Sequence, residues 1–232
     1  MGESELDGLN VLRSKTPNVP KAFGTISDRG EYFIVLEYIE NIPLQDSDSI
    51  YETLLPVYSC QGEYWGWKMN NYVGNLLQKN SIHRDFTSYF LQDRIEPLLF
   101  MGSEKDWIDF AFKKSILSLI EKKSIEWGLG ETTPRLIQGD LWSGNFLQNK
   151  NNKVFLIDPS VSYGHPEQDF AMAHLFGGVP TNWIHPISKK LGIEEGFSER
   201  LLFWQIYPLL VHLRLFGGSY LESLKHAVRR YL

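Results

Sequence analysis

The sequence predicts an α+β fold in which a small N-terminal part precedes a larger, mainly helical part. Three observations support this prediction: leucines at helical spacing near the N-terminus, two short apolar runs joined by a turn signal, and several long helical stretches further along. The chain has 232 residues, of which 43% are hydrophobic and 22% charged, an ordinary composition for a globular protein. This length suits one large or two small domains with ample core.

A helix is predicted over residues 3–14. Leucines recur there at three-residue spacing and glutamates occupy the first turn: Leu6, Leu9, Leu12, Glu3 and Glu5. Acidic side chains stabilise the start of a helix, so the two patterns agree. Pro17 and Pro20 then end the segment, because proline cannot continue a helix.

Two strands are predicted next, over Ala22 to Ser27 and Tyr32 to Tyr38. Asp28-Arg29-Gly30 between them is a turn signal, so the pair should form a hairpin.

A domain hinge is predicted just after this hairpin. Glu37-Tyr38-Ile39-Glu40-Asn41 leads there into a loop rich in proline, aspartate and serine. We therefore expect a small domain of residues 1–40 and a large helical domain of residues 41–232.

The large domain should contain helices over 49–59, 84–101 and 105–127, and Gly128 and Gly130 fit the end of the last one. Two short strands, Arg135 to Ile137 and Lys153 to Ile157, are predicted to bracket a polar loop, and from Asp169 onward the chain should be mostly helical.

Two further apolar patterns occur near the C-terminus. Leu-Phe-Gly-Gly occurs twice, at 175–178 and 215–218, and should mark helix ends because neither copy follows a strand. Residues 201–216 form the most apolar stretch, but it is too short and too often interrupted to cross a bilayer. We interpret it as a buried core helix.

The composition narrows the functional class. A formal charge of −5 without a basic run argues against a general nucleic-acid binder. Cys60 is the only cysteine, so a disulfide framework within the chain and a multi-cysteine metal site are excluded. With no signal peptide or spanning segment recognised, we expect a cytoplasmic protein that does not engage membranes.

The polar loop carries the chemistry. Asn145 follows Asp140 by five residues, and Asp158 follows Asn145 by thirteen, at the end of the apolar run Val154 to Ile157. Phosphoryl-transfer enzymes use an aspartate, an asparagine and a second aspartate at these intervals. The expected roles are catalytic base for Asp140 and Mg²⁺ ligands for Asn145 and Asp158, with ATP as phosphoryl donor. A structural alternative is that the three residues only cap a turn and end a strand.

Beyond these residues, the chain resembles the fructosamine kinase (ketosamine-3-kinase) family along essentially its whole length. The matching segments run in family order: Glu5-Leu6-Asp7-Gly8-Leu9, Val35-Leu36-Glu37-Tyr38, Trp65-Gly66-Trp67, Asn71, Gly74, Gln78, Asn80, Gly139 to Asn145, Ile157 to Ser160, Tyr163 to Met172, Leu175 to Gly178, Tyr207 to Leu210 and Leu215 to Leu221.

The resemblance implies a protein-kinase-like fold, shared with aminoglycoside phosphotransferases, and ATP-dependent phosphorylation of a ketosamine sugar hydroxyl. Ketosamine small molecules or glycated proteins would be the acceptors, and protein deglycation the outcome. By position, Glu37, Tyr38 and Ile39 would form the adenine hinge, and Glu5 the carboxylate that normally pairs with a nucleotide-binding lysine.

The sequence also departs from the family pattern. It starts at the helix that carries Glu5, so we expect a partial small lobe without the nucleotide-covering loop and lysine, and weak or absent kinase activity. The hairpin would then have an open edge, through which we expect self-association. Gln138 replaces the family's usual histidine, and Val211 and Arg214 stand where asparagine is common.

Further side chains are substrate-site candidates: Trp142, His165, Glu167, Tyr207 and His212. Aromatic residues of this kind are more often core, and the His165/Glu167 pair lacks the partners of a metal site. Asp169 is expected to be structural, as a cap of the helix that follows.

Two alternatives to a ketosamine kinase stay open. One is a pseudokinase-like binding module that keeps the cleft without catalysis. The other is a small-molecule kinase for an amino alcohol or an aminoglycoside.

Overall fold

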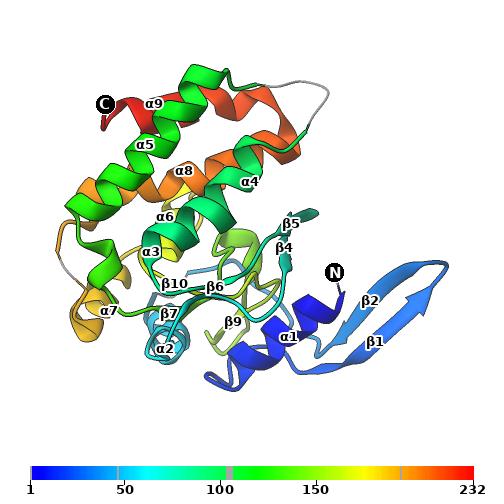
Figure 1. Cartoon of the computed structure of the whole chain (residues 1–232). Coiled ribbons are helices and arrows are strands. Elements are labelled where there is room, and N and C mark those ends of the chain that lie inside the picture. The colour runs from blue at the N-terminus through cyan, green and yellow to red at the C-terminus, as the bar shows by residue number, and fades with distance from the viewer. Residues whose placement is uncertain (1, 46, 103–106, 194) are drawn as a thin grey trace.

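The structure is a computed structural model that describes residues 2–45, 47–102, 107–193 and 195–232. It confirms the predicted α+β class. In Figure 1 the helix α1 and the hairpin β1–β2 lie at one end of the molecule, and the long helices α5, α8 and α9 lie at the other. Short strands lie between these two ends.

The N-terminal segment forms the predicted helix and hairpin. Helix α1 spans Gly2–Arg13, and β1 (Ala22–Asp28) pairs antiparallel with β2 (Glu31–Leu36). The two turn residues have positive φ, 50° at Arg29 and 85° at Gly30. A tight two-residue hairpin turn requires this backbone conformation at both positions, and Gly30 adopts it without steric cost.

Helix α1 shares its core with the first part of the large domain. Leu9 and Leu12 of α1 belong to one buried cluster with side chains of α2 (Ser47–Tyr58) and of two later strands: Leu54, Val57, Phe146 and Leu156. The predicted division after residue 40 stays a prediction, and α1 is fixed by apolar contacts to residues on the other side of it.

Eight short strands make up the middle of the molecule. They are β3 (Trp65–Gly66), β4 (Asn71–Val73), β5 (Leu76–Gln78), β6 (Ile82–His83), β7 (Arg135–Ile137), β8 (Phe146–Gln148), β9 (Val154–Leu156) and β10 (Ser162–Gly164). Strands β6, β3, β10 and β7 form an antiparallel sheet in that order, and β4–β5 and β8–β9 are separate hairpins. Only β7 and β9 were predicted, because short apolar runs on either side of the polar loop indicated them; on their own, strands of two or three residues are too short for a pattern of alternation.

The predicted helix over 84–101 is present but changes its winding midway. It runs as α3 (Phe86–Tyr89), a π-helical turn (Phe90–Ile95) and α4 (Glu96–Leu99). The wider turn places Asp93 and Arg94 in the interior, at 2% and 1% exposure.

The remaining helices are α5 (Phe110–Glu126), α6 (Glu167–Leu175), α7 (Ile184–Leu191), α8 (Phe197–Phe216) and α9 (Leu221–Arg229). The predicted start of α5 at residues 105 and 106 lies outside the described residues. Both Leu-Phe-Gly-Gly segments end helices, α6 and α8, as predicted. None of the helices in the described ranges is both long enough and apolar enough to span a membrane.

Apolar side chains are exposed on both faces of the β1–β2 hairpin. Five of its aromatic and aliphatic residues are exposed: Phe23, Ile26, Tyr32, Phe33 and Val35. An exposed apolar edge strand tends to pair with another chain. Self-association through this edge stays a prediction.

Phe33→Lys should therefore weaken self-association by about tenfold, which corresponds to about 1.4 kcal/mol. The reason is that a charged side chain on an edge strand opposes strand pairing. Light scattering over a concentration series measures the mass. Phe110→Lys is the control, because Phe110 is also an exposed phenylalanine, at the start of α5 and away from the hairpin. Equal masses for the three proteins would contradict a role for the hairpin.

Candidate active site

The polar loop leaves β7 through a backbone turn that only glycine accommodates. Gly139 has φ +88°, and a Cβ atom there would lie 2.0 Å from the carbonyl oxygen of Ser160. The loop therefore passes directly against the segment that follows Asp158. This close approach brings the two halves of the predicted motif together.

Asp169 fixes the conformation of this loop. Its carboxylate accepts hydrogen bonds from the backbone N–H of Gln138 at 2.8 Å and of Gly139 at 2.9 Å. The hydroxyl of Tyr58 donates a third, at 3.0 Å. The expectation that Asp169 caps α6 is wrong, because its carboxylate binds loop N–H groups instead of those of its own helix.

Gln138 joins the loop that carries Asp140 to the segment that carries Asp158, which explains how a glutamine can stand where the family resemblance led us to expect a histidine. Its side-chain oxygen accepts the backbone N–H of Asp140 at 2.7 Å, while its amide donates to the carbonyl of Ile157 at 3.0 Å. The residue is fully buried. A glutamine amide supplies the donor and the acceptor that this bridge needs.

Asp140 and Asn145 are in direct contact. The Asn145 amide donates to Oδ2 of Asp140 at 3.1 Å and to its backbone carbonyl at 2.8 Å. Asp158 follows β9 with φ +49°, an uncommon conformation for a residue other than glycine. The backbone carbonyl of Asp158 lies 3.5 Å from the same amide, so the three predicted residues meet in one place.

Burial and neighbouring carboxyl groups raise the pKa of the acidic side chains around Asp158. Burial, and then the charge of Asp158, raise the pKa of Asp140 to about 7. Burial also raises the pKa of Asp158, and burial followed by the Asp158 charge raises that of Glu5. Three acidic groups that resist ionisation together are a setting that a divalent cation would relieve.

The side-chain oxygens of Asn145 and Asp158 are suitable ligands for Mg²⁺. The Asn145 amide nitrogen is committed to Asp140, which turns Oδ1 away from that contact, and no described residue donates to Oδ1. The Asp158 carboxylate likewise accepts no hydrogen bond from the described part of the chain. Oxygen ligands in small number are what Mg²⁺ takes from a protein, with phosphate and water completing the shell.

The predicted nucleotide residues lie in two segments, α1 and the chain that follows β2. Glu5 and Asp158 line one small cleft together. The segment that carries Glu37, Tyr38 and Ile39 continues alongside β8, where Ile42 donates to the carbonyl of Gln148 at 2.8 Å. The backbone groups of Tyr38 and Ile39 make no hydrogen bond to any described residue.

Comparison with known proteins identifies the family. The fructosamine kinase family model matches residues 1–232, the whole chain. The chain belongs to the fructosamine kinase family. As a member of this family of kinases, it is a phosphotransferase.

Individual relatives support the same family assignment. A protein of Enterococcus faecium named "Probable ketoamine kinase" is 33% identical over 225 residues, which cover 94% of this chain and 78% of the relative. The crystal structure of a provisionally assigned fructosamine-3-kinase of Haemophilus somnus 129PT superposes with a TM-score of 0.86 at 26% identity, covering 99% of this chain and 79% of that one.

A third comparison bears on the fold alone. An aminoglycoside phosphotransferase, solved as a ternary complex with AMP-PNP and hygromycin B, gives a TM-score of 0.61 at 12% identity, covering 97% of this chain and 83% of that one. The chain therefore has the protein-kinase-like fold that the resemblance implied.

Two of the substrate candidates belong to an aromatic wall beside the family's catalytic motif. Trp142, two residues after Asp140, is 40% exposed and meets Phe176 edge-on. His212 packs against the same Phe176 with ring centroids 4.2 Å apart. The first Leu-Phe-Gly-Gly segment thus connects the two predicted residues.

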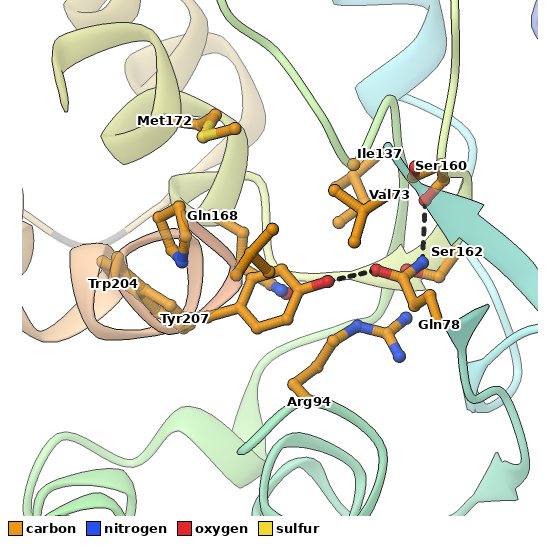
Figure 2. Close-up of a pocket in the computed structure, with 13 residues that line it drawn as sticks. Val73, Gln78, Arg94, Ile137, Ser160, Ser162, Gln168, Met172, Trp204 and Tyr207 are labelled. Atoms are coloured by element: carbon orange, nitrogen blue, oxygen red, sulfur yellow. Dashed lines mark hydrogen bonds between the residues drawn. The ribbon is translucent and has the colours of Figure 1, made fainter. Parts of the chain in front are cut away.

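Tyr207 instead lines an internal cavity below the loop (Figure 2). Its hydroxyl donates to the side chain of Gln78, whose amide donates to the carbonyl of Ser160 at 3.3 Å. The cavity measures about 10 Å³, room for about one water molecule. Through Gln78, Tyr207 therefore supports the backbone at Ser160, two residues after Asp158, and contact of Tyr207 with a sugar stays a prediction.

His165 and Glu167 have structural partners. Arg200 holds the Glu167 carboxylate through two hydrogen bonds of 2.8 and 2.7 Å, and Trp204 donates a third. His165 stacks on Trp204, 5.1 Å between centroids. No group of three or more His, Cys, Asp or Glu residues in the described ranges could hold a metal. The geometry does not favour substrate contact for Glu167.

Removal of the Asp169 carboxylate should destabilise the fold. Asp169→Ala leaves two buried N–H groups and the Tyr58 hydroxyl without their acceptor, so we expect a loss of about 2–4 kcal/mol in the free energy of unfolding. Urea denaturation measures it. Asp109→Ala, which removes an exposed helix cap on α5, should cost about 1 kcal/mol. Equal losses for the two variants would contradict the loop clamp.

The raised pKa of Asp140 predicts a pH-dependent stability. Because the pKa is about 7 in the folded protein and near 3.8 when unfolded, stability is lost as pH rises between these values. Asp140→Asn removes this loss, so its stability relative to the wild type should grow by on the order of 2 kcal/mol from pH 5 to pH 8. Thermal unfolding measures the trend, and Asp28→Asn in the exposed hairpin turn is the control. A pH-independent difference would show that Asp140 ionises normally.

Proposed function

We propose that this chain catalyses the Mg²⁺- and ATP-dependent phosphorylation of a ketosamine sugar hydroxyl. The observation that carries the proposal is the contact between Asp140 and Asn145 beside Asp158, with the pKa of Asp140 raised to about 7. A base with this pKa can take a proton near neutral pH. The names of the relatives supply the acceptor class.

Asp140 acts as the catalytic base. Its Oδ2 accepts from Asn145, whereas Oδ1 has no donor among the described residues and is open to a substrate hydroxyl. As the hydroxyl oxygen bonds to the γ-phosphorus of ATP, its proton passes to Asp140. The bond from that phosphorus to the β–γ bridging oxygen breaks, and ADP leaves with the electron pair.

Asn145 and Asp158 hold the metal. When bound, Mg²⁺ neutralises charge on the transferred phosphoryl group. Asn145 also orients Asp140 through its amide, so one side chain connects the metal and the base.

Tyr38 and Ile39 bind adenine through backbone groups, and Glu5 faces the phosphates. Support comes from the backbone groups of Tyr38 and Ile39, which bond to no described residue, from the cleft that Glu5 shares with Asp158, and from the fold likeness to a phosphotransferase solved with AMP-PNP. Their position beside β8 links the nucleotide to the same segment that follows Asn145.

The aromatic wall formed by Trp142, Phe176 and His212 provides the sugar-binding surface. Aromatic faces stack on the apolar faces of sugar rings and leave the hydroxyls free to reach a base. We place the reaction in the cytoplasm, where phosphorylation of ketosamines on proteins or small molecules would lead to deglycation.

Two variants separate base from metal ligand. With fructosyl-lysine as acceptor, Asp140→Asn should lower kcat by roughly 10²–10⁴-fold with little change in nucleotide affinity. Asp158→Asn should instead raise the Mg²⁺ concentration needed for half-maximal rate. A coupled assay of ATP consumption measures both, and Asp48→Asn, an exposed helix-start aspartate, is the control.

The same assay distinguishes the alternatives. Phosphorylation of choline or an aminoglycoside in preference to fructosyl-lysine would replace the acceptor class and keep the chemistry. Ketosamine binding without ATP consumption would indicate a binding module. Wild-type turnover by Asp140→Asn would contradict the assigned base.

A further inference from the structure

A second, polar pocket lies apart from Asp140, Asn145 and Asp158, none of which lines it. It measures about 320 Å³ and is formed by the segment that joins α5 to β7, the start of β7, the β10–α6 connection, the segment after α7 and the start of α8. This volume falls in the range of small-molecule sites. Arg135, His165, Arg200 and Glu131 contribute its charged and titratable side chains.

His165, one of the residues that line this pocket, carries a ring N–H donor. Its ring is 3% exposed and fixed by stacking on Trp204, and Nδ1 accepts the backbone N–H of Glu167 at 3.2 Å. Burial lowers the pKa of His165 to about 4, so the ring is neutral at physiological pH. A neutral imidazole whose Nδ1 accepts carries its proton on Nε2. No described residue accepts from this Nε2–H.

Arg135 adds an uncompensated positive charge. Its guanidinium donates to two backbone carbonyls, those of Tyr58 at 3.0 Å and Leu191 at 3.1 Å, and forms no ion pair with a described carboxylate. Arg200, in contrast, is neutralised by Glu167. Within the described residues, the pocket therefore combines a guanidinium without a carboxylate partner, that of Arg135, with the N–H donor of His165, and both favour an acceptor with negative charge.

We propose that this pocket binds a small oxyanion, the phosphate or carboxylate group of a metabolite, between Arg135 and His165. Glu131, exposed at the rim, opposes an anion and limits its affinity. The site is independent of the proposed kinase chemistry.

The location gives such a ligand a structural consequence. Arg135 begins β7, which leads into Gln138, and His165 precedes α6, which carries Asp169. A bound oxyanion would join the two segments whose contact holds the catalytic loop.

Calorimetric titration of the full chain with sulfate, inorganic phosphate and acetate tests the proposal. Mg-ADP is present throughout, to occupy the nucleotide site. Arg135→Gln should weaken binding at least about tenfold, the loss expected for a charge-assisted hydrogen bond. Arg135→Lys should retain part of it, and Arg229→Gln, an exposed arginine of α9, should change nothing. Glu131→Gln should tighten binding about two- to fivefold by removing a like charge.

The ¹⁵N and ¹H signals of His165 provide a readout that a structural role for Arg135 would not move. Saturating sulfate should shift the Nε2–H signal and leave the tautomer unchanged. A preference for sulfate and phosphate over acetate would identify a phosphate-bearing ligand, and the reverse a carboxylate. Equal affinity in wild type and Arg135→Gln, loss of binding in Glu131→Gln, or an unmoved His165 signal would each overturn the proposal.

Discussion

The rest of the site depends on one contact. The buried Asp169 carboxylate accepts hydrogen bonds from two backbone N–H groups of the loop. It fixes Gln138 and Gly139, and Gln138 in turn holds Asp140 and the carbonyl of Ile157. Burial raises the pKa of Asp169 to about 6, while the hydrogen bonds from Gly139, Gln138 and Tyr58 favour its charged form. The stability of the loop is thus coupled to the charge of a residue that lies outside the contact between Asp140, Asn145 and Asp158.

Part of this arrangement could be predicted from the sequence, because the proposed active-site residues are few and stand at intervals typical of phosphoryl-transfer enzymes. The intervals between Asp140, Asn145 and Asp158 predicted a meeting that the geometry shows, although their roles stay predictions. The β1–β2 hairpin and the helix α8 followed from a turn signal and an apolar run, since both are local features of the chain.

The contacts that hold the site together could not be predicted from the sequence, for physical reasons. An aspartate in the first turn of a helix can cap that helix or bind N–H groups of a loop far away in the sequence. The sequence around Asp169 does not distinguish the two roles. Strands of two or three residues show no alternation, so β3, β6 and β10 carried no signal, whereas β7 and β9 were indicated by their apolar runs on either side of the polar loop. The His-x-Glu spacing does not reveal that Arg200 and Trp204 occupy the Glu167 carboxylate, and substrate contact of His165 and Glu167 stays a prediction.

The π-helical turn at Phe90–Ile95 has a consequence for the history of the fold. Such a turn contains one residue more than an α-helix needs for the same span, so it behaves as a single-residue insertion. The insertion rotates Asp93 and Arg94 inward, where Arg94 binds the carbonyl of Lys79 and the side chain of Asn80. Deletion of one residue there would restore regular winding and turn these two charged side chains by about 100°. The length of this segment, as much as its composition, is therefore under constraint.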